Sequence, residues 1–97
     1  MNEILTKSEI NQFNKDGAIF LKGKFSINWI EKLKKGIERD IKNPSPGFKS
    51  HTIKKDVPAY LEDYWTWHLV PEFKEFVYNS PYAQIASELM SAKKINL

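Results

Sequence analysis

Residues 27–42 place the strongest constraint on folding in this sequence. Their apolar side chains recur at steps of three and four residues, which is typical of one face of an α-helix over four turns: Ile27, Ile30, Leu33, Ile37 and Ile41. Such a stripe needs a cover, and burying one of these side chains stabilises a fold by roughly 1.5–3 kcal/mol. We therefore expect the helix to pack this stripe against an N-terminal helix and a helix at 81–90.

The ends of this helix are also marked in the sequence. Ser26 is the expected N-cap, and Phe25 and Ile30 have the spacing of a hydrophobic staple. Pro44 biases the preceding residue away from helical geometry and so ends the helix. Gly36 within it has two readings: it permits close approach to a neighbouring element, or it is an exposed glycine that costs about 1 kcal/mol relative to alanine.

A first, shorter helix is expected between Thr6 and Gly17. Thr6 and Glu9 have the spacing of a capping box, and Leu5 and Ile10 that of a staple. Gly17 suits the left-handed residue that closes a helix. The following residues, "AIFLK", alternate in the manner of a short strand at 18–22.

The second half of the chain gives weaker signals. Residues 47–58 are polar and predict a loop, and the aromatic run after them predicts no clear structure. Pro71 suits the first turn of a short helix. Ser80 is expected to cap a helix with Pro81 at its first position, and a strand is expected near 94–97. Together these signals predict one domain, 1–97, of mainly α class with short β-strands (α+β).

Composition narrows the classes of function. The chain has no cysteine, which excludes disulfides and thiolate chemistry and suits a reducing cytoplasm. No apolar run approaches the roughly 20 residues of a membrane span, and no signal peptide is recognisable. The chain has a net charge of +3, and its basic residues concentrate in "EKLKKGIERDIK", where Glu31, Glu38 and Asp40 interrupt them. Such mixed signs indicate a solvated face rather than a nucleic-acid patch. We expect a cytoplasmic protein that binds neither membrane nor nucleic acid.

Few residues suggest chemistry. His51 and His68 stand in unrelated segments without the spacing of a metal motif. Glu62 and Asp63 are adjacent carboxylates, and solvated side chains are the stronger interpretation of such a pair. A cluster of aromatic residues and a histidine has two interpretations, as part of the core or as the lining of a pocket: Trp65, Trp67 and His68.

Two stretches resemble a known enzyme family. "LTKSEINQFNKDGAIFLKGKFS" is similar to the opening of the phytanoyl-CoA dioxygenase family, with a capped helix containing "F...DG", a short strand and a long helix. "WHLVPEFKEFVYNSPYAQIASELMSAKKINL" is similar to the segment that follows in bacterial members and leads into the catalytic barrel. The resemblance covers nearly the whole chain except residues 43–58.

The resemblance implies that this chain is the N-terminal helical part of a double-stranded β-helix (cupin-like) oxygenase, without the barrel. The family uses Fe(II) and 2-oxoglutarate to hydroxylate an unactivated carbon, with the metal held by a His-x-Asp pair and a distant histidine. No position here matches those ligands or the basic residue that holds 2-oxoglutarate. We therefore assign no catalytic, cofactor-binding or metal residue, and expect a truncated segment, inactive alone, whose chemistry lies past Leu97. The alternative is a stand-alone binding or assembly module.

The same resemblance bears on assembly. Without a barrel, the two expected terminal strands leave apolar side chains in need of a cover: Ile19, Leu21, Ile95 and Leu97. A second copy of the chain is the simplest source of that cover, so we expect a homodimer or a higher assembly. In an intact relative, Trp65, Trp67 or His68 is expected to face the mouth of the active site.

Overall fold

The computed structural model describes residues 3–51, 55–56 and 59–96. Within these ranges the chain forms four α-helices, a two-stranded sheet and a short 3₁₀ helix: α1 (Lys7–Asp16), α2 (Ile27–Lys42), β1 (Lys49–His51), β2 (Tyr60–Glu62), η1 (Thr66–His68), α3 (Pro71–Asn79) and α4 (Tyr82–Met90). The prediction of a mainly helical α+β chain is confirmed, while its relation to a cupin-like oxygenase stays a prediction. None of the helices formed by the described residues combines the length and apolar composition that a membrane crossing requires.

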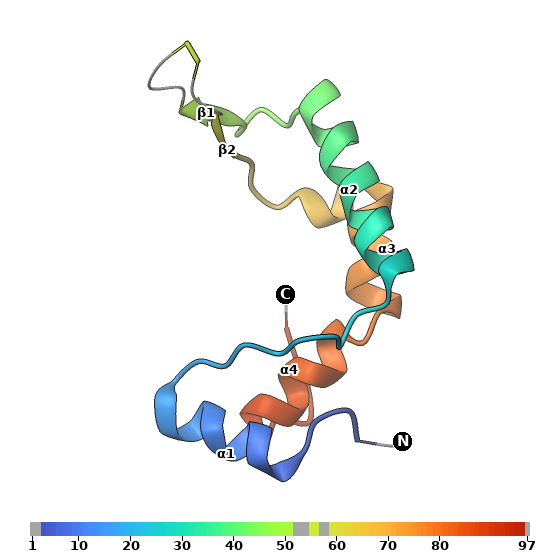
Figure 1. Cartoon of the computed structure of the whole chain (residues 1–97). Coiled ribbons are helices and arrows are strands. Elements are labelled where there is room, and N and C mark those ends of the chain that lie inside the picture. Colours follow the sequence, from blue (N-terminus) through green and yellow to red (C-terminus); the bar gives the residue numbers. More distant parts are fainter. Residues whose placement is uncertain (1–2, 52–54, 57–58, 97) are drawn as a thin grey trace.

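The helices do not gather around one centre (Figure 1). α1 and α4 pack together at one end, α2 and α3 lie side by side in the middle, and the β1–β2 hairpin stands at the other end. The Cα radius of gyration is 16.2 Å, against about 12.5 Å for a compact domain of this length. In the described part of the chain the buried apolar side chains are Leu5, Val70 and Ile85. Several small contacts, rather than one large core, hold the chain together.

The predicted ends of α1 are confirmed. The Thr6 hydroxyl accepts a hydrogen bond from the Glu9 amide at 3.1 Å, and the Glu9 carboxylate accepts one from the Thr6 amide at 2.9 Å. Gly17 closes the helix with φ 76°, in the left-handed region that glycine adopts without strain. Local chemistry alone therefore fixes both ends of this helix.

The two predicted terminal strands are not present in the described residues. Residues 18–21 have no regular secondary structure, Lys22 lies in a turn, and Phe20 is 86% exposed. An isolated extended segment has no partner for its backbone groups, so alternation alone does not make it a strand. Residues 94–96 likewise form no strand, and Leu97 lies outside the described residues.

The predicted packing of α2 is wrong. α2 packs against α3, and α1 packs against α4 instead of against α2. Ser26 stands at the N-cap position of α2, but its side chain makes no capping hydrogen bond. Ile37 is half exposed, so the expectation that burying it holds the fold together is also wrong. The reason is that Gly36, on the opposite side of α2, allows α3 to approach more closely than the isoleucine side does.

The segment predicted as a loop contains a strand. β1 pairs antiparallel with β2, with Lys49 opposite Glu62 and His51 opposite Tyr60. Both faces of this short hairpin are largely exposed. The sequence pattern does not predict this hairpin, because an exposed hairpin needs no alternation of apolar and polar residues.

α3 and α4 begin close to where the sequence predicts. Pro71 opens α3, and the Ser80 hydroxyl accepts a hydrogen bond from the Tyr82 amide at 3.2 Å at the start of α4. α4 starts one residue later than predicted, since Pro81 occupies the N-cap position. From α4 the Glu88 carboxylate accepts hydrogen bonds from the amides of Ile4 and Leu5 at 2.8 to 3.1 Å, which ties the N-terminal segment to this helix.

Candidate functional site

The contact between α2 and α3 is built around Gly36. A Cβ atom added at this position would lie 2.5 Å from Cε1 of Phe73 and 3.1 Å from Cβ of Glu72. Such distances are shorter than van der Waals contact, so only glycine lets α3 lie this close to α2. Of the two readings of Gly36 from the sequence, close approach is therefore the correct one.

Ion pairs also join α2 to α3 on both sides of that contact. Arg39 donates two hydrogen bonds to the Glu72 carboxylate, from Nε at 2.7 Å and from Nη2 at 2.9 Å. The hydrogen bonds raise the pKa of Arg39 and hold the pKa of Glu72 below its usual range. About two turns earlier on α2, Lys32 Nζ lies 2.6 Å from Glu75 Oε1 of α3. The α2–α3 pair is thus a small apolar contact with a charged rim.

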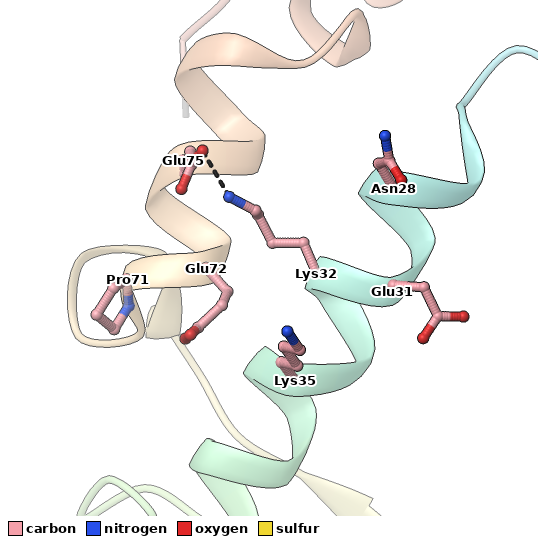
Figure 2. A pocket seen from close by; sticks show the side chains of 7 residues that line it. All are labelled: Asn28, Glu31, Lys32, Lys35, Pro71, Glu72 and Glu75. Atoms are coloured by element: carbon pink, nitrogen blue, oxygen red, sulfur yellow. Dashed lines mark ion pairs between the residues drawn. The ribbon is translucent and has the colours of Figure 1, made fainter.

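A groove of about 400 Å³ runs along this rim (Figure 2). Figure 2 shows Lys32 reaching from α2 to Glu75 on α3, with Lys35 and Glu72 one turn away and Glu31 pointing away from α3. Glu31 lies 3.6 Å from Lys34 on its own helix. Because positive and negative side chains alternate along the groove, it presents no field of one sign that would select an anion or a cation. Its charges serve to hold two helices together.

The opposite side of α2 is uncovered. We call it the isoleucine face; its members share one side of the helix and are exposed by 63%, 41%, 51% and 48% respectively: Ile27, Ile30, Ile37 and Ile41. At about 100° per residue, these four side chains fall within an arc of about 80°, with Gly36 roughly opposite Ile27. Lys34 lies inside the same arc. The stripe that the sequence marks for burial is therefore the surface that the chain leaves open.

An apolar groove adjoins the N-terminal half of this face. It has a volume of about 370 Å³ and is lined mainly by apolar side chains from α2, α3 and the segment between α1 and α2, among them Phe20, Phe25, Ile30, Leu33 and Phe76. Ile30 belongs both to this groove and to the isoleucine face. The two features together form one continuous apolar surface along α2.

A carboxylate pair joins the C-terminal end of α2 to the hairpin. Asp40 on α2 shares a hydrogen bond with Asp63, which directly follows β2, and burial together with this neighbour raises the pKa of Asp40 to about 6. Burial also acts on Asp63, but hydrogen bonds from the hydroxyl and amide of Ser45 lower its pKa to about 2. The two carboxyl groups therefore lie next to each other where α2 and β2 end, and a proton on Asp40 relieves the repulsion between them. No sequence signal marks this pair, because its members lie in segments predicted as helix and as unassigned chain.

The carboxylates that are adjacent in sequence point to different partners. The Glu62 carboxylate lies 3.1 Å from Nε2 of His51 across the hairpin, while Asp63 turns toward Ser45. Adjacent residues in extended chain project in opposite directions, so the two do not form one acid–base site. Within the described ranges no group of three or more His, Cys, Asp or Glu side chains is arranged to hold a metal ion.

The aromatic cluster divides into two parts. The Trp67 ring packs edge-on against Tyr78 of α3, with ring centroids 5.9 Å apart, and lies 5.6 Å from the His68 ring. Trp65 has φ 51° and is 82% exposed. Trp67 therefore contributes to packing of η1 on α3, whereas Trp65 and the exposed His68 face solvent. Their role at the mouth of an active site in an intact relative stays a prediction.

Comparison of the chain with protein-family models, with curated proteins and with solved structures finds no match. Its function is therefore inferred from its own surface and packing. The feature that stands out is the isoleucine face of α2 with the adjoining apolar groove.

Proposed function

We propose that this chain is a helical interaction module whose role is to pack the isoleucine face of α2 against another protein surface. The observation that carries this proposal is the exposure of four isoleucines on one arc of a helix whose other side is already packed. Scattered apolar residues are normal on a surface, but a contiguous row of them indicates a contact site.

The exposed area agrees with this proposal. The solvent-accessible surface is 8020 Å², against about 5,800 Å² for a folded monomer of this mass. The excess is about 2,200 Å², and a stable protein–protein interface takes about 800 Å² from each partner. The open shape thus exposes more surface than one such interface would cover.

Substitution of the face tests this function. An Ile30→Asp, Ile37→Asp double variant should keep the helical circular dichroism and lose only about 1 kcal/mol of unfolding free energy per site, because the two side chains are 41% and 51% exposed. It should also bind less of a fluorescent dye for apolar surfaces. The unfolding free energy of the wild-type chain should be extrapolated to low protein concentration, so that association does not contribute to the comparison.

The matched comparison is Val70→Asp, which places the same charge at a buried site. That variant should unfold, since an unpaired charge cannot be buried without large cost. Loss of structure in the double variant, equal to that of Val70→Asp, would show that the isoleucine face is part of the core and would refute the proposed function.

A second candidate follows from the resemblance to phytanoyl-CoA dioxygenases. We propose as this alternative that the chain is the N-terminal helical region of such an Fe(II)/2-oxoglutarate oxygenase, in which the face would cover the catalytic barrel. It is supported by helices at 7–16, 27–42, 71–79 and 82–90, the order that the resemblance implies. The chain itself would then work in the cytoplasm without holding iron or 2-oxoglutarate. Anaerobic calorimetric titration with both should give no heat of binding, and stoichiometric micromolar binding would contradict this.

A further inference from the structure

We infer that the partner of the isoleucine face is a second copy of this chain, packed antiparallel along α2 across a two-fold axis near Ile37. This inference rests on the proposed function, because it identifies what covers the same face. It goes further in naming the occupant, the direction of the two helices and the position of the axis.

The spacing on α2 is that of a helix–helix seam. Positions 27, 30, 34, 37 and 41 alternate steps of three and four residues, as the a and d positions of a coiled coil do. Four of the five are isoleucine, and the fifth is Lys34. α2 is about 24 Å long, so two copies laid side by side can cover each other's row. A repeat of this kind fits another helix better than it fits a flat or irregular surface.

Lys34 decides the direction of the two helices. If the two-fold axis ran along the helices, each residue would face its own counterpart, and two ammonium groups would meet at Lys34 inside an apolar seam. Like charges brought together in this way cost several kcal/mol and exclude a partner. An antiparallel pair with its axis near Ile37 separates the two lysines along the seam and places Ile37 of each copy beside Ile37 of the other.

The charges along one edge of the face agree with this register. Lys35 and Glu38 are equidistant from a point between Gly36 and Ile37. The same holds for Lys42 and Glu31, which also lies 3.6 Å from Lys34 of its own helix. These four exposed side chains lie on the arc that adjoins the isoleucine face beside Ile27. Antiparallel pairing about that point brings Lys35 opposite Glu38 and Glu31 opposite Lys42, once on each side of the axis. The edge is complementary to itself.

Mass in solution is the first test. By light scattering at micromolar concentrations the chain should have twice the monomer mass of 11.4 kDa. Ile37→Glu should lower it to the monomer mass with unchanged helicity. Met90→Glu makes the same kind of change at a 64% exposed position on α4 and should leave the dimer intact. A wild-type mass of 11.4 kDa at every concentration would overturn the inference of a second copy. The proposed function is tested separately, by whether the Ile30→Asp, Ile37→Asp variant folds.

Single cysteines test the direction, since the chain contains none. Ile37→Cys lies near the axis and should oxidise to a covalent dimer. Ile27→Cys lies ten residues along the helix, about 15 Å away, so its copies should remain unlinked. A disulfide needs Cα atoms within about 7 Å of each other. Equal cross-linking at both positions would show a parallel pair and overturn the antiparallel arrangement.

A charge exchange tests the register. Glu38→Lys should weaken dimerisation by roughly three- to tenfold, because it places like charges opposite each other on both sides of the axis. The Lys35→Glu, Glu38→Lys double variant exchanges the two charges and should restore the wild-type dissociation constant. If the double variant is as weak as the single one, the proposed register is wrong.

Discussion

The two sides of α2 differ in what they require of a neighbour. The Gly36 side has no side chain at its centre, and α3 fills that space so closely that one added carbon would overlap Phe73. The isoleucine face has far more apolar surface and yet remains open. The difference shows that hydrophobicity alone does not choose the packed side of a helix. Shape decides which neighbour within the same chain can reach a given side, and we propose that the open side packs against a partner.

Among the substitutions that test this difference between the two sides, the largest change in stability is expected at Gly36. Gly36→Ala should destabilise the fold by about 1–3 kcal/mol, because the new methyl group overlaps the Phe73 ring. This outcome opposes the gain of about 1 kcal/mol that alanine normally brings to a helix. Urea unfolding measures it.

Gly47→Ala is the matched control, since a Cβ there meets its neighbours at 3.7 Å or more. It should change stability by less than about 0.5 kcal/mol. A stabilising Gly36→Ala would mean that α3 does not depend on this close approach, and the contrast between the two sides would disappear.

A smaller effect, visible through pH, is expected at Asp40. Its pKa is raised from 3.8 to about 6 in the folded chain, so the folded state holds a proton that the unfolded state loses. Stability therefore falls as pH rises from about 4 to about 6 and then levels off. Asp40→Asn removes this carboxylate charge, so it should raise the melting temperature by a few degrees at pH 8 and change it little at pH 4. A variant that melts below wild type at pH 8 would contradict the raised pKa of Asp40.

Asp63 gives the opposite slope at lower pH. Its pKa lies at about 2, so its contribution to stability is complete above 3.8 and is lost as pH falls toward 2. The profile of the wild-type chain should therefore have a maximum near pH 4. Asp40→Asn should remove only the fall on the alkaline side of this maximum.

A smaller effect still is expected at the charged rim. Glu72→Gln keeps the shape of the side chain but removes the charge that holds Arg39 in two hydrogen bonds. Because the pair lies at the surface, the melting temperature should fall only slightly, and the difference should shrink in concentrated salt. A large loss that salt does not reduce would show that the rim, rather than Gly36, carries the α2–α3 contact.

The smallest effect is expected on the open side. Ile41→Ser, made in the monomeric Ile37→Glu background so that association does not contribute, should alter the unfolding free energy by less than about 0.5 kcal/mol. A cost of several kcal/mol would show that Ile41 is buried in solution and that the two sides of α2 are alike.

The sequence predicted what is local and failed where a partner had to be chosen. Thr6, Gly17 and Pro71 mark helix ends through local chemistry and were placed correctly. The helix that Ser80 was expected to cap begins one residue later, with Pro81 at the N-cap position. The isoleucine stripe shows which side of α2 needs a cover, but not that α3 would take the other side. Gly36 was the one signal of that choice, and it allowed two readings.

The hairpin and the carboxylate pair were missed for related reasons. β1 is formed by polar residues that carry no alternation, so only its pairing with β2 defines it. Asp40 and Asp63 meet because the hairpin folds back toward α2, a long-range contact that neither segment encodes by itself. Residues 18–22 show the reverse case: their alternation suits a strand, but the described residues supply none to pair with them.

The hydrogen bonds from Ile4 and Leu5 to Glu88 join residues that are 83 and 84 positions apart. During synthesis at about 5–20 residues per second, the N-terminal segment waits roughly 4–17 s before its carboxylate partner is made. Leu5 is buried in the folded chain. Throughout this interval it lacks the hydrogen bond that its amide donates to Glu88. Closing so long a loop is also a late step in refolding, because the chain loses conformational entropy before the stabilising contact forms. The α1–α4 end should therefore be the last part of a newborn chain to become ordered, and the part on which a ribosome-bound chaperone has the longest time to act.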